Sequence, residues 1–154
     1  MAKKKTAPRK SPTAAKLKST AELTRDTANP RKITKKAATG LSKSLERFGD
    51  LSGIVFNQGT GELVAGHQRM NQIKERWGER DVVLIDSKTN LHGIRIDDEH
   101  FFPVRVVKWS KAKQRAANVA ANNAKIAGEF TDDLSSYLLE VHSELDSEMP
   151  SILE

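Results

Sequence analysis

The fold of this chain is decided by the stretch Gly61-Glu62-Leu63-Val64-Ala65-Gly66-His67-Gln68-Arg69, in which a short apolar strand leads directly into a helix. The first N–H groups of a helix have no partner within it, and the helix dipole places partial positive charge at the same end. Gly66 lets the backbone approach an anion closely, and Arg69 adds a cation in the first turn. His67 and Gln68 offer further donors. The stretch therefore predicts a phosphate-binding turn, with an ordinary strand-to-helix junction as the alternative interpretation.

The segments on either side of this turn predict a hairpin, a helix and another strand. Residues 53–57 and 62–65 are apolar and enclose a turn that contains two glycines, which is typical of a β-hairpin. Residues 81–86 read as a mostly buried strand. The intervening helix is indicated by an apolar face that ends at a glycine: Met70, Ile73, Trp77 and Gly78.

The first part of the chain predicts a strand, a turn and a helix. Residues 20–26 suit a short edge strand. Pro30 indicates a turn, because it keeps Asn29 out of the α region. Thr34 then fits the N-cap of a helix with apolar residues at helical spacing up to Phe48.

The second half of the chain completes a small α/β (α+β) fold, in which a mixed sheet packs against helices. Residues 87–100 are polar and suit an inserted loop or hairpin rather than a core element. Residues 101–109 alternate with an apolar bias and predict a strand, and Thr131 begins a last helix. Ser110 fits the cap of a helix whose small residues permit close packing: Ala112, Ala116, Val119 and Ala120.

Charge divides the chain of 154 residues into three parts. Residues 1–20 carry seven Lys and Arg and no acid, so we expect a disordered basic tail that binds DNA without sequence preference. A purely solubilising tail is the alternative. Residues 21–128 form the expected domain, and residues 129–154 hold eight acids and no Lys or Arg. The tail cations assigned to DNA are Lys3, Lys4, Lys5, Arg9 and Lys10.

Composition excludes several classes of protein. The chain has no cysteine, which rules out disulfides, a thiolate nucleophile and a cysteine zinc site. No apolar run approaches the roughly 20 residues of a membrane-spanning helix. We therefore expect a protein without a membrane partner, in the bacterial cytosol or in the cytoplasm of a phage-infected host cell.

Several motifs follow one another in a familiar order. They are Asn29-Pro30-Arg31, Leu45-Glu46-Arg47-Phe48-Gly49, Ile54-Val55-Phe56-Asn57, Ala65-Gly66-His67-Gln68-Arg69, Val104-Arg105-Val106-Val107, and the run from Asn122-Asn123 to Phe130. In this order they resemble the ParB/sulfiredoxin superfamily, in particular the ParB-like domains of phages and mobile elements. The resemblance covers about residues 20 to 145.

The resemblance implies a domain that binds a nucleoside triphosphate. The turn from Gly66 to Arg69 would hold the phosphates, Arg31 would lie at the nucleotide, and Asn123 would lie near a magnesium ion bound with it. ParB proteins use CTP in this way and sulfiredoxins use ATP. The expected cofactor is therefore CTP or ATP with Mg²⁺.

Two departures from the family pattern limit what can be carried over. Sulfiredoxins have their reactive cysteine in the corresponding turn, so the lack of cysteine excludes that activity. Asn122 stands where segregation-type ParB proteins have a glutamate, which puts nucleotide hydrolysis in doubt. A weak nucleoside triphosphatase or nuclease activity therefore stays open, as does homodimerisation.

Three functions from different classes remain. The first is a nucleotide- and DNA-associated accessory or regulatory protein of phage or mobile-element origin. The second is a ParB-like, metal-dependent DNA nuclease, for which the sequence offers no clear carboxylate pair. The third is a non-enzymatic interaction module that partners a DNA methyltransferase or another phage or DNA-processing protein. We favour the first.

Overall fold

A five-stranded mixed sheet carries the fold, with the strands in the order β2-β1-β5-β4-β3. The computed structural model of this chain describes residues 17–29, 32–48, 51, 53–98, 100–121, 132–136 and 139. Within these ranges β1 pairs in parallel with β5, and the other neighbouring strands are antiparallel. The strands are β1 (Ile54–Asn57), β2 (Glu62–Ala65), β3 (Val82–Asp86), β4 (Leu91–Arg95) and β5 (Phe101–Val107).

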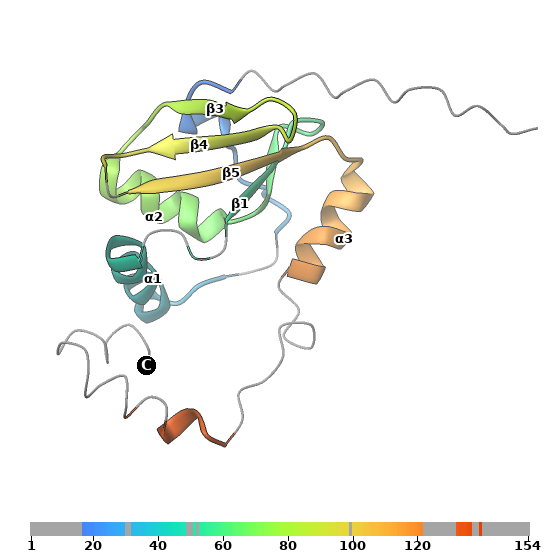
Figure 1. Ribbon diagram of the computed structural model, residues 1–154. Coiled ribbons are helices and arrows are strands. Elements are labelled where there is room, and N and C mark those ends of the chain that lie inside the picture. The colour runs from blue at the N-terminus through green and yellow to red at the C-terminus, as the bar shows by residue number, and fades with distance from the viewer. Residues whose placement is uncertain are drawn as a thin grey trace, which may run out of the picture.

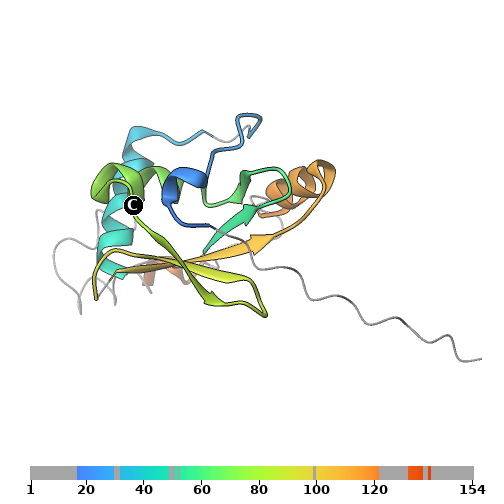
Figure 2. The ribbon, with the colours of Figure 1, turned by 90° about the horizontal axis from the view of Figure 1, so that it is seen from above.

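Three helices accompany the sheet: α1 (Lys35–Phe48), α2 (His67–Trp77) and α3 (Lys111–Ala121). Two views at right angles place α1 and α2 together on one face of the sheet, whereas α3 lies apart from them (Figures 1 and 2). The core fills the space between the sheet and the helix pair, with Leu45, Ile73 and Phe102 among its buried side chains. None of the described helices has the length and apolarity needed to cross a membrane.

The expected helix boundaries are confirmed where local signals mark them. Thr34 caps α1, since its Oγ1 accepts a hydrogen bond from the Ala37 N–H at 3.2 Å. Ser110 caps α3 in the same way, with Oγ accepting from the Lys113 N–H at 3.3 Å. Gly78 ends α2 with a positive φ of 73°. The predicted β1–β2 hairpin is also present.

The prediction for residues 20–26 was wrong. Instead of an edge strand they contain a 3-10 helix, η1 (Thr20–Glu22), and the chain makes only isolated bridges to the sheet on either side of it. A capping box explains the helix, because the Ser19 hydroxyl accepts from the Ala21 N–H (3.1 Å) while the Glu22 carboxylate accepts from the Ser19 N–H (3.1 Å).

The burial of two strands was also mispredicted. β3 is an edge strand, so Val83, Leu84 and Ile85 are each more than 40% exposed. Residues 87–100 do form a hairpin with β3, but they contribute β4 to the core, where His92 and Ile94 are fully buried. β4 lies inside the sheet, and this position rather than its polar flanks decides its burial.

The structure tests the last two predicted helices to different extents. α3 does not pack through its alanines: its buried residues are Gln114 and Asn118, and Val119 is 63% exposed. Of the acidic helix expected after Thr131, the structure describes only residues 132–136 and 139, with helical geometry at 134–136 and 139. The rest of that prediction lies outside the described residues.

Candidate phosphate-binding site

The turn between β2 and α2 is built around Gly66. This residue is the N-cap of α2, with φ 86° and ψ 17°, a left-handed conformation that side chains disfavour. A Cβ here would lie 3.0 Å from Cγ1 and 3.1 Å from Cα of Ile54, which is tighter than most contacts of real Cβ atoms. Gly66 also supplies no side-chain cap to the first N–H groups of α2. The positive end of the helix dipole is therefore open to an external anion.

The other three residues of the turn do not all face the same way. Gln68 and Arg69 are partly exposed, and Gln68 Oε1 accepts a weak bond from Asn71 Nδ2 at 3.4 Å. His67 is only 5% exposed. Its Nε2 accepts a long hydrogen bond from the Asp26 N–H at 3.4 Å. The imidazole is thus engaged inside the protein, so the part of His67 that remains for an anion is its backbone N–H.

The environment of His67 keeps the imidazole neutral. Burial lowers the pKa of His67, and the nearby Arg25 guanidinium lowers it further. Since the pKa is lower in the folded state than in the unfolded chain, the neutral ring contributes stability above about pH 6.5. That contribution is lost as the pH falls through the folded-state pKa of His67.

Other predicted site residues lie outside the described part of the chain. They are Arg31, Asn123 and the tail cations Lys3, Lys4, Lys5, Arg9 and Lys10.

A polar cluster next to the turn joins segments that are distant in sequence. Gln114 Nε2 donates to Asp26 Oδ2 (3.0 Å) and Glu62 Oε2 (2.8 Å). Gln114 Oε1 accepts from Asn57 Nδ2 (2.9 Å). Lys111 Nζ bridges the same two carboxylates, at 3.3 Å from Asp26 Oδ2 and in closer contact with Glu62. The cluster fixes the start of α3 against the sheet and the segment before α1.

The charges of this cluster stabilise one another. Burial acts to raise the pKa of Asp26, but hydrogen bonds from the Ala28 N–H, Gln114 and Lys111 hold it below its ordinary value. The hydrogen bond from Lys111 lowers the pKa of Glu62, and Glu62 in turn raises the pKa of Lys111. Both carboxylates and the ammonium are therefore ionised at neutral pH.

The sequence interpretation missed this cluster. One signal was available: Lys111, Gln114 and Asn118 form a polar stripe at helical spacing on a helix that otherwise looks alanine-rich. Asn118 Nδ2 donates to the Val64 carbonyl at 2.8 Å, so the stripe is the face that packs on β2. Nothing in the sequence pairs that stripe with Asp26 or Glu62, which lie far from it along the chain.

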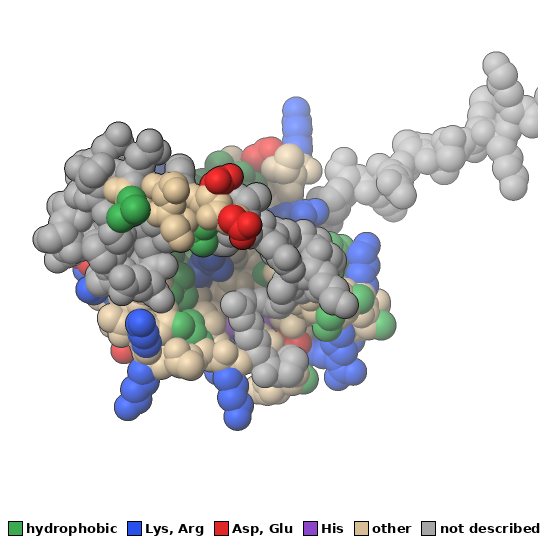
Figure 3. All heavy atoms as spheres, turned by 90° about the horizontal axis from the view of Figure 1, so that it is seen from below, with side chains coloured by type: hydrophobic (Ala, Val, Ile, Leu, Met, Phe, Trp, Pro, Cys, Tyr) green, Lys and Arg blue, Asp and Glu red, His purple; other side chains and the backbone are tan. Residues whose placement is uncertain are grey.

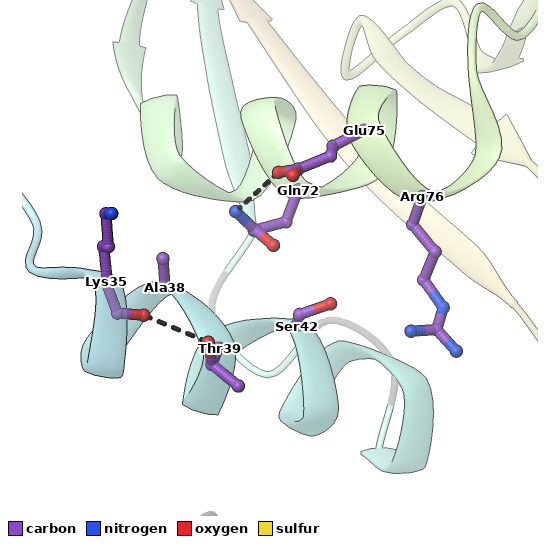
Figure 4. Close-up of a pocket in the computed structure, with 7 residues that line it drawn as sticks. All are labelled: Lys35, Ala38, Thr39, Ser42, Gln72, Glu75 and Arg76. Carbon is purple, nitrogen blue, oxygen red and sulfur yellow. Dashed lines mark hydrogen bonds between the residues drawn. The ribbon is translucent and has the colours of Figure 1, made fainter.

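A groove between α1 and α2 was missed as well. It has a volume of about 480 Å³, and its two walls come from the two helices (Figure 4). Arg76 reaches from α2 toward α1 and forms an ion pair with Glu46 there. The lining residues are Lys35, Ala38, Thr39, Ser42, Gln72, Glu75 and Arg76. Their polar and charged side chains suit a polar ligand rather than a lipid.

The described residues contain no group of three His, Cys, Asp or Glu side chains that could hold a metal ion.

One solved structure with a similar fold is the C-terminally truncated chromosome-partitioning protein ParB from Caulobacter crescentus, complexed with CTP-gamma-S. The two align with a TM-score of 0.55 over 86% of this chain and 67% of that chain. The fold is ParB-like. Sequence identity is 16%, so the likeness concerns the fold alone. No protein-family model matches the sequence. No curated protein matches it either.

Proposed function

We propose that this protein is a ParB-like, nucleotide- and DNA-associated accessory or regulatory protein of phage or mobile-element origin. The observation that carries the proposal is the Gly66 turn, where a left-handed glycine leaves the N-terminus of α2 without a side-chain cap. Such a helix end favours a phosphate through its backbone N–H groups and its dipole. The CTP analogue bound to the similar ParB supports a nucleotide as the source of that phosphate.

The residues present fit such a ligand. A Cβ at Gly66 would press on Ile54 and the Gly53 carbonyl, and the positive φ also disfavours a side chain, so glycine suits a turn this close to β1. Arg69 lies in the first turn of α2, a position from which a guanidinium can bind a phosphate held at the helix N-terminus. We assign Arg31 and Asn123 to the same site, Asn123 through Mg²⁺ carried by the nucleotide. We expect CTP as the ligand, with ATP as the alternative.

The groove between α1 and α2 supports a ligand larger than phosphate. Gln72, on its wall, lies five residues after His67, which is a rise of about 7.5 Å along the helix. The nucleoside part of a nucleotide spans such a distance, and the groove offers hydroxyl and amide groups from Thr39, Ser42 and Gln72. We propose that phosphate binds at the turn and the nucleoside lies along the groove.

Arg69→Ala should weaken nucleotide binding about tenfold or more, because it removes a hydrogen-bonding cation beside the phosphate. Isothermal titration of the full chain with CTP, ATP and GTP in the presence of Mg²⁺ measures the effect. Arg105→Ala is the matched control: this exposed arginine lies between the buried Val104 and Val106 and so faces the other side of the sheet. If the wild-type chain binds none of the three nucleotides, the proposal fails.

We also propose that the nucleotide is held rather than hydrolysed, because Asn122 offers an amide where the resemblance expects a carboxylate. Incubation of the chain with CTP and Mg²⁺, followed by a phosphate-release assay, should give no turnover above background. Sustained release that disappears in Arg69→Ala would show that the site is an enzyme.

DNA is assigned to the basic tail. The described surface has Lys and Arg side chains spread around the face seen from below rather than gathered in one patch (Figure 3). The tail, in contrast, concentrates seven cations without an acid in residues 1–20. Sequence-independent affinity follows from the release of counterions by such a cluster.

Deletion of residues 1–16 should weaken DNA binding and flatten its salt dependence, since it removes six of these cations. The slope of log K against log salt should fall by up to about five units. Fluorescence anisotropy on duplexes of two unrelated sequences measures both effects. A chain of unchanged length, with the six cations replaced by glutamine, should behave like the deletion. An unchanged slope in both variants would place the DNA contact elsewhere.

A further inference from the structure

Two hydrogen-bonded steps, joined at Asp26, lead from α3 to the first residue of α2. Gln114 and Lys111 both bind Oδ2 of Asp26, and Asp26 Oδ1 accepts from the Ala28 N–H at 2.9 Å. The backbone N–H of Asp26 then donates to Nε2 of His67. Asp26 is 4% exposed and His67 is 5% exposed, so water competes little for these bonds. The side chains of α3 therefore act on the geometry of the phosphate turn through Asp26.

We propose that Gln114 and Lys111 are positioning residues for the phosphate turn, acting through Asp26 on the imidazole of His67. The proposal rests on the function proposed for the turn. It goes beyond that function because it assigns a role to residues of α3 that touch no part of the turn themselves. His67 opens α2, so its ring orientation helps to fix where the N–H groups of the helix point.

The hydrogen bond to His67 Nε2 requires a ring that is unprotonated at this nitrogen. Because Nε2 accepts from the Asp26 N–H, the single proton of the neutral ring is on Nδ1. The imidazole thus ties α2 to the segment before α1. A proton on Nε2 would place the ring N–H of His67 next to the N–H of Asp26, so that two donors would face each other without an acceptor. The charged groups facing the ring are Arg25, Asp26 and Glu62.

A simpler role is that the cluster only anchors α3 on β2. Both roles predict a loss of stability when Gln114 is replaced, because its amide makes several hydrogen bonds in a buried site. The roles differ at His67. A mere anchor leaves the tautomer and titration of His67 unchanged in any variant that still folds, whereas a positioning role changes both.

The first test is NMR of the imidazole nitrogens in the ligand-free full chain. In the wild type, Nε2 of His67 should give the signal of an unprotonated nitrogen at pH 7. Gln114→Met and Lys111→Met should each produce a mixture of tautomers and move the titration of His67 toward the value of a free histidine. Lys111→Arg, which keeps the cation, should retain the wild-type signal. Arg115→Met, an exposed substitution on the same helix, is the control.

A wild-type His67 signal in folded Gln114→Met and Lys111→Met would overturn the proposal. If Gln114→Met does not fold, Lys111→Met decides the question, because the Lys111 side chain is 36% exposed and tolerates replacement better. This test requires no nucleotide, so its outcome is independent of the function proposed above.

The second test measures nucleotide affinity at a temperature at which each variant is fully folded by circular dichroism. Gln114→Met should weaken CTP binding by about two- to thirtyfold, the range found for residues that act through others. Arg115→Met should leave it unchanged. A normal affinity in Gln114→Met, together with a changed His67 signal, would overturn the link to the phosphate turn. Failure of the wild type to bind would instead overturn the proposed function.

Discussion

Replacing Gly66 with alanine should destabilise the folded protein by about 2 to 5 kcal/mol. About 1 to 2 kcal/mol of this is the cost of a side chain in the left-handed conformation. The rest comes from overpacking, because the new Cβ would lie 3.0 to 3.1 Å from Ile54 and 3.3 Å from the Gly53 carbonyl oxygen. Two of these three contacts are to backbone atoms of β1 or the residue before it, which cannot turn away as a side-chain end could.

Urea denaturation at pH 7 measures this effect, and the chain supplies a matched control. Gly61 also has a positive φ, of 74°, but a Cβ there would meet nothing within 4 Å. Gly61→Ala should therefore cost only the conformational part, about 1 to 2 kcal/mol. Equal destabilisation by the two substitutions would contradict the close approach of the turn to β1.

The same pair of variants separates folding from ligand binding. Gly66→Ala should also abolish nucleotide binding, because relief of the overlap moves the N–H groups of α2 away from β1. Gly61→Ala should bind normally once the fraction folded is taken into account. A Gly66→Ala variant that is folded and binds CTP with full affinity would remove the turn from the proposed site.

The sequence predicted those elements whose limits are set by local chemistry. Thr34 and Ser110 mark the starts of helices, and Gly78 marks the end of one. These signals can be seen in the sequence because each residue acts on the backbone within one turn of itself. The hairpin around Gly61 was predictable for the same reason. Gly66 belongs to this group as well, since its position between an apolar strand and a helix is visible in the sequence.

The sequence could not show which other element each strand or helix face packs against. β3 and β4 have similar lengths, yet β3 is exposed and β4 is buried, because one is at the edge of the sheet and the other inside it. The alanines of α3 suggest packing through small side chains. The helix instead packs through Gln114 and Asn118, because these side chains find hydrogen-bond partners on β2 and at Asp26. Such pairings join residues more than 50 positions apart, so no local pattern contains them.

The capping box at Ser19 is a different case, because its signal was present in the sequence but did not enter the prediction. Serine followed three residues later by glutamate indicates a helix start. The strand predicted for residues 20–26 left this signal out. In the structure the two reciprocal hydrogen bonds of the box decide the local conformation, and the sheet receives only single bridges from this segment.

Asn57→Ala should be the second strongly destabilising substitution, at about 2 to 5 kcal/mol. Asn57 is fully buried at the end of β1, and every hydrogen-bonding position of its amide is used. Nδ2 donates to the Trp109 carbonyl (3.1 Å) and to Gln114 Oε1 (2.9 Å). Oδ1 accepts from the N–H groups of Gly59 (3.0 Å) and Trp109 (2.9 Å). Truncation leaves both backbone groups of Trp109 without their partner in a site that water reaches poorly.

Asn57→Asp sharpens this prediction, because it keeps the shape and the two accepting bonds but changes the donor. Its second carboxylate oxygen would face two acceptors, the Trp109 carbonyl and Gln114 Oε1, close to the carboxylates of Glu62 and Asp26. We expect Asn57→Asp to be more destabilising than Asn57→Ala at pH 7. The difference in the free energy of unfolding between Asn57→Asp and the wild type should shrink as the pH falls. A buried carboxyl with a raised pKa takes up a proton and can then donate a hydrogen bond.

Denaturation in urea between pH 5 and pH 8 tests both substitutions against Asn71→Ala, an exposed asparagine on α2 that should change stability by no more than about 0.5 kcal/mol. If Asn57→Ala lowered the free energy of unfolding by no more than that margin, water would be replacing the hydrogen bonds of the amide without loss of stability. Asn57 also affects the orientation of Gln114. Its Nδ2 donates to Gln114 Oε1, while Gln114 Nε2 donates to Asp26. If the amide of Asn57 orients Gln114, then Asn57→Ala should change the imidazole signal of His67 in the same direction as Gln114→Met.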